Sequence, residues 1–386
     1  AQLINLSAPE QLSFAEASVN SAAERLADLG DEAGVAMARQ VRASALARLG
    51  RVGDCEAELD LALTAARSAD DRRRVTAVLG AAPVAALWGP SPVPRAGGRC
   101  LDVIRLLRIT TGSPAVEAVS VRCQGVLEAL RGRFDTARTM LATSRATAEE
   151  LGLRHGLMET ELYAGIVELL AGDPVAAEPH LRAAYGGLGK LGIGADAGQA
   201  AAHLARSLLL QDRLDEAEEL AADSDDLAGQ NPQSIIAARS VQAEILSARG
   251  QHEGAIETAR AAVAAAAGTD ILVDHANANA VLGRVLAAAG LDAEAATALA
   301  EAARLYGRKG ATVDLGAAST GAGEDGSAGP SQPIILRLDG AGLIDHTSVH
   351  DTGDMDRAVD ELDRHDLART AVAPGPGASP IPAVEN

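Results

Sequence analysis

The sequence predicts an all-α protein, a right-handed α-solenoid of about seven helical hairpins. A glycine or a stand-in for it recurs about every 40 residues, and a small residue that opens a second apolar segment follows five residues later in every unit but one. These anchors are Gly50, Gly89, Gly132, Gly172, Asp212, Gly250 and Gly290, with spacings of 39, 43, 40, 40, 38 and 40. In a chain of 386 residues this period predicts one elongated array of stacked repeats rather than two or three ordinary domains.

Each anchor is predicted to end one helix, because glycine takes the left-handed conformation of a helix C-terminus without strain. Aspartates shortly after four anchors suit the N-cap of the next helix: Asp135, Asp173, Asp215 and Asp292. The small residues at the fifth position are Cys55, Ala137, Ala177, Ala217, Ala255 and Ala295. In the Gly89 unit GPSPVPRA inserts two residues before Ala96.

A second set of small residues stands seven positions before the anchors, where the two helices of a hairpin would cross. They are Ala43, Ala82, Gly125, Gly165, Ala205, Ala243 and Gly283. Seven small residues in register predict a close approach of the paired helices.

The other breaks complete the helical pattern. A first helix is expected from Ser13 to Leu29, and later helices should break near Asp70, Gly112, Gly152, Gly192, Asn231 and Gly268. The longest loops are expected at 89–98 and 227–233, which makes them candidate contact points for a partner.

The repeat pattern stops after residue 312, and three further segments are expected. Residues 313–333 have the Gly/Ser-rich composition of a linker. Residues 334–366 have the pattern of a β-hairpin followed by an amphipathic helix, and the Pro/Gly-rich residues 367–386 are expected to be disordered. The chain begins at Ala1 without a methionine, so we expect a piece of a longer polypeptide.

Composition limits the core and the compartment. Aromatic residues make up only 2% of the chain, so Ala, Leu and Val must build the core, and Trp88, Tyr163, Tyr185 and Tyr306 are interpreted as structural residues. The three cysteines, Cys55, Cys100 and Cys123, form no CxxC pair. They are predicted to be reduced core residues of a cytoplasmic protein.

Charge argues against nucleic acid as a partner. The net charge is −19, and residues 311–386 carry 13 acidic against 4 basic groups, which leaves −10 for the remainder. Phosphate contacts need a basic stripe, which the pattern does not offer. The sequence contains no run of about eighteen uncharged apolar residues, which is the length that a membrane-spanning helix needs.

The motifs that could carry chemistry have structural interpretations. Gly189-Lys190 follows a helical pattern and lacks the Ser or Thr of a phosphate loop, and GAGEDG at 321–326 follows no predicted strand. DTGDMD at 351–356 lacks the glycine and glutamate positions of a calcium loop, and His346 and His350 have no third ligand. The sequence therefore predicts no catalytic residue, no cofactor and no metal.

The repeat units resemble a known family. LEALRGRFDTARTMLATSRATAEELG and ILSARGQHEGAIETARAAVAAAA look like tetratricopeptide repeats of a long, roughly forty-residue kind. ALWGPSPVPRAGGRC, ELLAGDPVAAEPHLRAAY and ARLYGRKGATV resemble the C-terminal helical region of large actinobacterial signalling proteins, which place an adenylate/guanylate cyclase domain and an AAA-type ATPase module before such repeats. Residues 334–366 resemble the last hairpin and helix of a SnoaL-like domain.

The resemblance implies a non-catalytic interaction or regulatory scaffold of a multidomain bacterial signalling protein. Its partner would be a protein or peptide, including the upstream cyclase or ATPase domains of the same polypeptide. The concave face of the solenoid is the expected binding surface, and Arg122, Glu161, Arg206 and Glu244 are its candidate residues. Two alternatives stay open: the C-terminal portion of a nucleotide cyclase with an ATP-binding AAA module, and the effector-sensing half of a transcriptional regulator.

Overall fold

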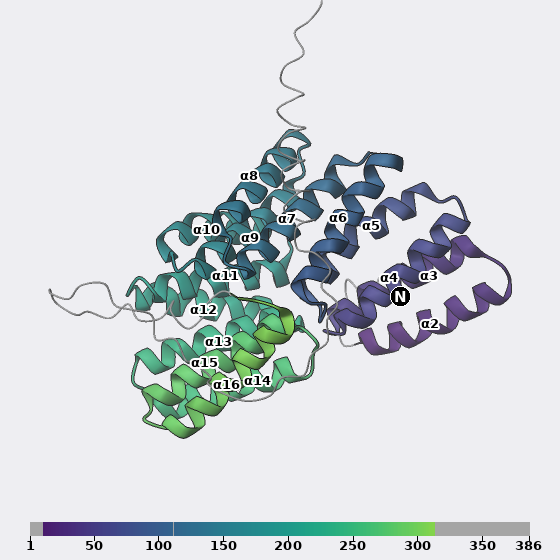
Figure 1. The fold of residues 1–386 in the computed structure, drawn as a ribbon. Coiled ribbons are helices and arrows are strands. Elements are labelled where there is room, and N and C mark those ends of the chain that lie inside the picture. Colours follow the sequence, from purple (N-terminus) through teal and green to yellow (C-terminus); the bar gives the residue numbers. More distant parts are fainter. Residues whose placement is uncertain (1–10, 111, 313–386) are drawn as a thin grey trace, which may run out of the picture. The chain divides into compact units, whose positions relative to one another are not determined.

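The structure is a computed structural model that describes residues 11–110 and 112–312. All regular structure in these residues is α-helical (Figure 1). The helices are α2 (Leu12–Asp28), α3 (Glu32–Arg48), α4 (Val52–Ser68), α5 (Arg72–Trp88), α6 (Val93–Thr110), α7 (Pro114–Leu130), α8 (Phe134–Glu150), α9 (Arg154–Leu170), α10 (Pro174–Lys190), α11 (Gly194–Leu209), α12 (Leu214–Ala228), α13 (Pro232–Ala248), α14 (His252–Ala267), α15 (Leu272–Ala288) and α16 (Asp292–Lys309).

Seven hairpins follow α2, and each turns at a predicted anchor. They are α3–α4, α5–α6, α7–α8, α9–α10, α11–α12, α13–α14 and α15–α16. Five glycine anchors and Asp212 have positive φ, as expected for a left-handed helix end. Gly89 differs: its φ of −72° and ψ of −175° are extended, and a four-residue connection through Pro92 leads into α6. The predicted all-α solenoid of about seven hairpins is confirmed.

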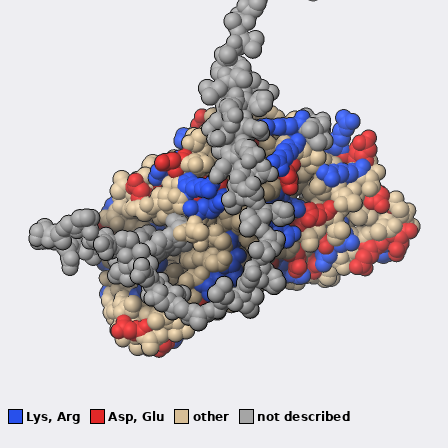
Figure 2. All heavy atoms as spheres, in the orientation of Figure 1, with Lys and Arg blue, Asp and Glu red and all other residues tan. Residues whose placement is uncertain are grey.

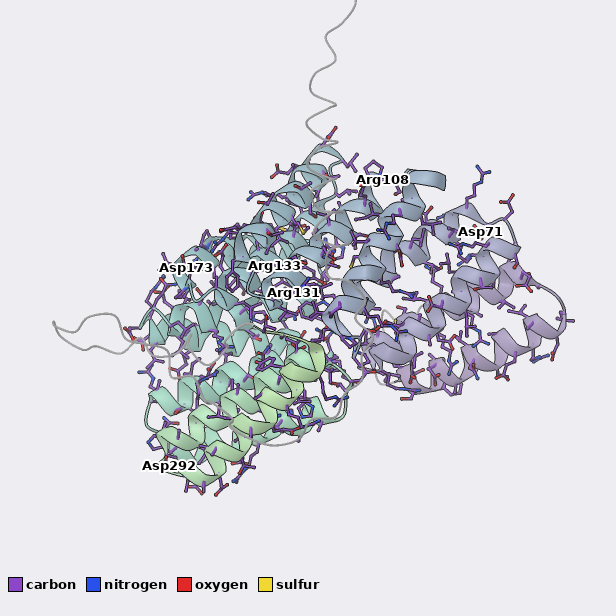
Figure 3. All side chains as sticks on the ribbon, in the orientation of Figure 1. Asp71, Arg108, Arg131, Arg133, Asp173 and Asp292 are labelled. Atoms are coloured by element: carbon purple, nitrogen blue, oxygen red, sulfur yellow. The ribbon has the colours of Figure 1, made fainter. Side chains whose placement is uncertain are left out.

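The helix caps agree with the sequence only in part. Asp173 caps α10 by accepting a hydrogen bond from the Ala176 amide at 2.9 Å. Asp135, Asp215 and Asp292 were expected to cap but lie inside the first turns of α8, α12 and α16. There their charge favours the positive end of the helix dipole. Figure 3 labels Asp173 and Asp292, together with Asp71, which caps α5.

The first helix of each hairpin forms an inner layer. Successive first helices, α3, α5, α7, α9, α11, α13 and α15, pack on one another along the array. Each second helix packs on its own first helix and on the first helix of the next hairpin. The concave surface predicted from the sequence therefore belongs to the odd-numbered helices from α3 onward.

The small residues have the roles that the spacing predicted. A side chain on Gly165 would place its Cβ 2.4 Å from Leu181 Cγ, and one on Gly283 would come 2.6 Å from Leu299 Cγ. All the small residues at the fifth position after the anchors are buried, as is Ala96. The close crossing of the paired helices therefore depends on the small residues seven positions before the anchors and on those five positions after them.

Most of the core is Ala, Leu and Val, with one aromatic pair in its centre. Trp88 Nε1 donates a hydrogen bond to the Tyr163 hydroxyl at 3.0 Å, and the two rings meet edge to face with centroids 5.6 Å apart. Both are buried, whereas Tyr185 and Tyr306 are half-buried. Cys55, Cys100 and Cys123 are buried free thiols, and burial raises the pKa of each.

Two predicted loops are shorter than expected. Helix α6 begins at Val93, so the segment expected as a loop at 89–98 is helical over its second half. The second connection spans only residues 229–231, because α12 continues to Ala228 and α13 starts at Pro232. Pro232 opens α13, because proline is compatible with the geometry of the first position of a helix. The linker, the β-hairpin with its helix, and the tail expected after residue 312 lie outside the described residues.

The last hairpin packs against the first ones. The Lys309 ammonium, buried at the end of α16, donates to the carbonyl oxygens of Ala86, Gly89 and Ser91 at 3.2, 2.8 and 2.9 Å. The Asp270 carboxylate, before α15, accepts from the amides of Val52 and Gly53, both at 2.7 Å. These contacts, which we call the closure, join residues more than 200 positions apart and curl the described array back onto α4–α6 (Figure 1).

Candidate functional site

Polar side chains gather on the inner layer where α9, α11, α13 and α15 meet. Two small cavities, of about 50 and 40 Å³, lie side by side there. They share His203, Arg206 and Asn277 in their lining. We call this surface the inner polar surface; its other polar residues are Gln199, Gln233, Ser240, Glu244, Asp274, Arg284 and Tyr306.

Glu244 is the centre of an ion-pair cluster. Arg284 Nη2 lies 2.5 Å from Glu244 Oε1, and Arg206 Nε lies 3.7 Å from Oε2. Burial would raise the pKa of Glu244, but the two arginines outweigh burial and lower it. Glu244 Oε2 and Ser240 Oγ are buried and have no hydrogen-bond partner among the described residues. Within the described part of the chain, Glu244 Oε2 has only the ion pair with Arg206, and Ser240 Oγ has unused hydrogen-bonding capacity.

The titration of two neighbours is strongly shifted. Burial and the nearby Arg206 lower the pKa of His203 to about 4, so this imidazole is neutral at pH 7. Burial raises the pKa of Asp274 to about 6, although a hydrogen bond from Gln233 at 3.1 Å acts the other way. The Tyr306 hydroxyl donates to Asn277 and ties α16 to α15.

The four residues nominated from the sequence divide into two pairs. Arg206 and Glu244 are brought together on the inner polar surface. Arg122 is only 2% exposed; its guanidinium donates to the Gly156 carbonyl and pairs with Glu159 at 3.0 Å. It also lies 5.1 Å from the centroid of the Tyr163 ring, at cation–π distance.

Glu161 is likewise buried, at 4% exposure. Its carboxylate contacts His180 Nδ1 at 2.6 Å and Arg145 Nη1 at 3.2 Å. Arg122 and Glu161 thus join α7 and α9 to their neighbours inside the array. Periodicity placed both on inner helices, but it could not show which side of each helix the next hairpin covers.

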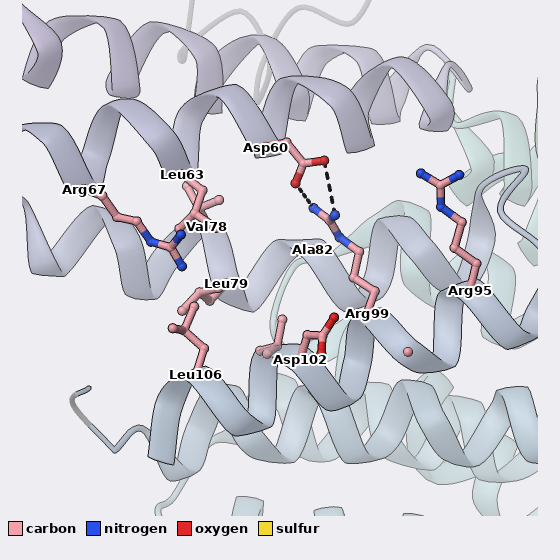
Figure 4. A pocket seen from close by; sticks show the side chains of 12 residues that line it. Asp60, Leu63, Arg67, Val78, Leu79, Ala82, Arg95, Arg99, Asp102 and Leu106 are labelled. Atoms are coloured by element: carbon pink, nitrogen blue, oxygen red, sulfur yellow. Dashed lines mark hydrogen bonds and ion pairs between the residues drawn. The ribbon is translucent and has the colours of Figure 1, made fainter. Parts of the chain in front are cut away.

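A second surface lies on the outer side of the array. A cavity of about 350 Å³ opens between the second helices α4 and α6, with α5 as its floor (Figure 4). We call it the arginine groove; its lining is Asp60, Leu63 and Arg67 from α4, Val78, Leu79 and Ala82 from α5, and Arg95, Gly98, Arg99, Asp102, Val103 and Leu106 from α6.

The groove is locally basic in an acidic chain. The lining has three arginines and two aspartates, and residues 60–110 contain eight arginines and four aspartates, which gives +4 where the whole chain has −19. Figure 2 shows Lys and Arg side chains gathered over the end of α5 and α6. Figure 3 labels Arg108, which belongs to α6. The net charge of the whole chain does not reveal this local excess of arginine. A running count of charge along the sequence would have found it.

The described residues carry no group of three or more His, Cys, Asp or Glu side chains placed to hold a metal ion. Nor is any described helix long and apolar enough to cross a membrane. The inner polar surface offers hydrogen-bond acceptors, and the arginine groove offers arginines above an apolar floor. Both sets of groups are suited to binding.

Comparisons with known proteins give structural relatives only. No family model and no curated protein sequence matches the chain. Among solved structures, BtubC (BKLC) from P. vanneervenii is 14% identical over 84% of this chain and 98% of its own, with a TM-score of 0.30. A tetratricopeptide repeat protein from Parabacteroides merdae is 13% identical over 78% of this chain and 100% of its own, with a TM-score of 0.39.

Proposed function

We propose that this chain is a non-catalytic interaction scaffold that binds a protein or peptide partner on the inner polar surface. One observation carries this proposal: Ser240 Oγ is buried without a hydrogen-bond partner among the described residues, and the neighbouring Glu244 Oε2 has only the 3.7 Å ion pair with Arg206. Buried polar atoms usually form hydrogen bonds, so two oxygens on adjacent turns of α13 that form none within the described residues favour a ligand that donates hydrogen bonds.

The layer around these acceptors suits an extended partner. Gln199, Gln233 and Asn277 of three successive first helices line one cavity, and Ile166 and Leu170 of α9 line the other together with Asn277. Stacked helical repeats commonly use such a concave surface for binding. Backbone amides of a bound peptide would donate to Ser240 Oγ and Glu244 Oε2. Ile166 and Leu170 would contact apolar side chains of the peptide.

The test is photo-crosslinking from defined positions. A photoreactive amino acid at Gln199 or Gln233 should crosslink a partner in an extract of the source cells. The photoreactive amino acid in place of Val175, an outer position that is 67% exposed, serves as the control. Crosslinks that Glu244→Gln and Ser240→Ala weaken would support the proposal. Equal crosslinking from Val175, or no effect of the two substitutions, would contradict it.

We also propose that the partner is the upstream part of a multidomain signalling protein of the cyclase–ATPase type. The family resemblance of the repeats supports this. Titration calorimetry of the chain against a separately produced cyclase–ATPase fragment, with cyclase activity followed in parallel, should detect binding that changes the activity. A folded chain that does not bind the fragment would leave the scaffold proposal intact but exclude this partner.

A further inference from the structure

We propose that the arginine groove is a docking site for an acidic amphipathic helix of a partner protein. It lies between second helices, on the opposite layer from the inner polar surface. The two surfaces can therefore be tested separately, and failure at one leaves the other in place.

The walls of the groove match a helix in length and direction. Helix α4 contributes residues 60, 63 and 67, and α6 contributes residues from 95 to 106, so each wall repeats at intervals of three or four. At 1.5 Å per residue the walls extend roughly 10 and 16 Å, which corresponds to two to three helical turns. A helix laid between α4 and α6 would pack as a further member of the outer layer.

The floor is apolar and its wall has room for a close approach. Leu63 and Leu106 are half-buried and supply the exposed aliphatic surface, over Val78, Leu79 and Val103, which are buried. Gly98 faces open space, since a Cβ added there would meet nothing within 4 Å. A helix with apolar residues at i, i+3, i+4 and i+7 could bury that stripe against this floor.

Arginines at the rim set the charge of the partner. Arg99 is paired with Asp60 across the middle of the groove, whereas Arg67 and Arg95 stand toward its two ends (Figure 4). Neither Arg67 nor Arg95 forms an ion pair among the described residues, and both are exposed. Carboxylates flanking the apolar stripe of a bound helix would pair with them.

The net charge of the chain does not prevent this association. Exposed charges are screened beyond about 8–10 Å at physiological ionic strength, so a docking segment responds mainly to the local arginine excess. Nucleic acid fits less well, because the aliphatic floor offers no polar group to phosphates or bases, whereas it can pack against the apolar stripe of a helix.

A designed peptide tests the proposal directly. The probe is a fluorescein-labelled amphipathic helix of about eighteen residues with a leucine stripe flanked by glutamates. Its twin carries lysine at every glutamate. We expect the acidic peptide to bind in anisotropy titrations at least about tenfold more tightly than its twin, and binding to weaken on raising the salt concentration.

Two double variants locate the site. Arg67→Glu with Arg95→Glu should weaken binding of the acidic peptide at least about tenfold. Arg25→Glu with Arg48→Glu changes the net charge equally at exposed arginines of α2 and α3 and should leave binding within about twofold. Circular dichroism would verify that both variants are folded.

Three outcomes would overturn the proposal. One is equal binding of the acidic peptide and its basic twin. Another is equal weakening by the two double variants, which would show a general charge effect. The third is a single-stranded oligonucleotide of equal charge that binds as tightly as the peptide and is lost in the same groove variant; the groove would then be a polyanion site.

Discussion

The contacts of single side chains with small residues determine how closely the helices pack. Gly165 in α9 faces Leu181 in α10, and Leu181 is fully buried. Because the neighbour cannot move into solvent, a methyl group at this position must displace packed atoms. The core has few large side chains that could adjust to such a change.

Gly165→Ala should destabilise the protein by about 1–3 kcal/mol through overpacking. Gly186→Ala in α10 is the matched control, since a Cβ there meets nothing within 4 Å. It should stabilise by roughly 0.5–1 kcal/mol because alanine has the higher helix propensity. Urea unfolding of both variants measures the difference, and similar effects would contradict the crossing assignment.

His203 and Asp274 give opposite pH dependences. The pKa of His203 is about 4 in the folded chain and near 6.5 when unfolded, so the unfolded state binds more protons and stability falls as the pH drops from 6.5 to 4. The pKa of Asp274 is about 6 when folded and near 3.8 when unfolded, so stability rises as the pH drops from 6 to 3.8.

The two effects therefore offset each other below pH 6. Asp274→Asn removes the stabilising effect of protonating Asp274 in the folded state. This variant should therefore lose about 1–2 kcal/mol more stability than the wild type between pH 6.5 and 4.5. His203→Asn should lose less than the wild type over the same range. Urea unfolding at four pH values tests both, and profiles parallel to the wild type would contradict the assigned shifts.

At the scale of the element, the helix ends decide where each hairpin turns. Asp212 occupies an anchor position with φ of 59°, whereas the corresponding Gly172 has φ of 77°. An L-residue in this region is strained, although aspartate tolerates it better than most. The period survives at Asp212 because the conformation, rather than the residue type, is what the turn requires.

Asp212→Gly should stabilise the protein by about 0.5–1 kcal/mol by removing that strain. The converse change, Gly172→Ala, should destabilise it by about 1 kcal/mol or more. Thermal unfolding of the two variants gives the comparison. A loss of stability in Asp212→Gly would show that the aspartate side chain contributes more than the backbone strain costs.

For the array as a whole, the closure joins the last hairpin to the first two. Lys309 donates to the carbonyl oxygens of Ala86 in the last turn of α5 and of Gly89 and Ser91 in the α5–α6 connection, and Asp270 accepts from the amides at the start of α4. Buried carbonyl groups that lose such a partner are costly. The inner polar surface includes Tyr306 of α16, which packs on α15 and donates to Asn277.

Lys309→Met should destabilise the protein by about 2–4 kcal/mol and raise hydrogen exchange in α15 and α16 before the rest unfolds. Lys190→Met is the control, because Lys190 is exposed at the end of α10 and is the other lysine of the chain. Hydrogen exchange detected by mass spectrometry distinguishes the two. Unchanged exchange in α15 and α16 of Lys309→Met would show that the closure does not depend on this side chain.

The sequence by itself determined the repeat period, the hairpin ends and the small residues at the helix crossings. These features depend on contacts between neighbouring segments, so they leave a local pattern such as the Gly165 and Gly172 spacing. Only the tertiary structure decided that Arg122 is buried, that Lys309 closes the array and that α4 and α6 leave a groove. The closure depends on the small rotation from one hairpin to the next, which accumulates along the array and brings together residues more than 200 positions apart. The burial of Arg122 and the groove depend on how the side chains of adjacent hairpins pack, which the spacing of residue types along the sequence does not specify.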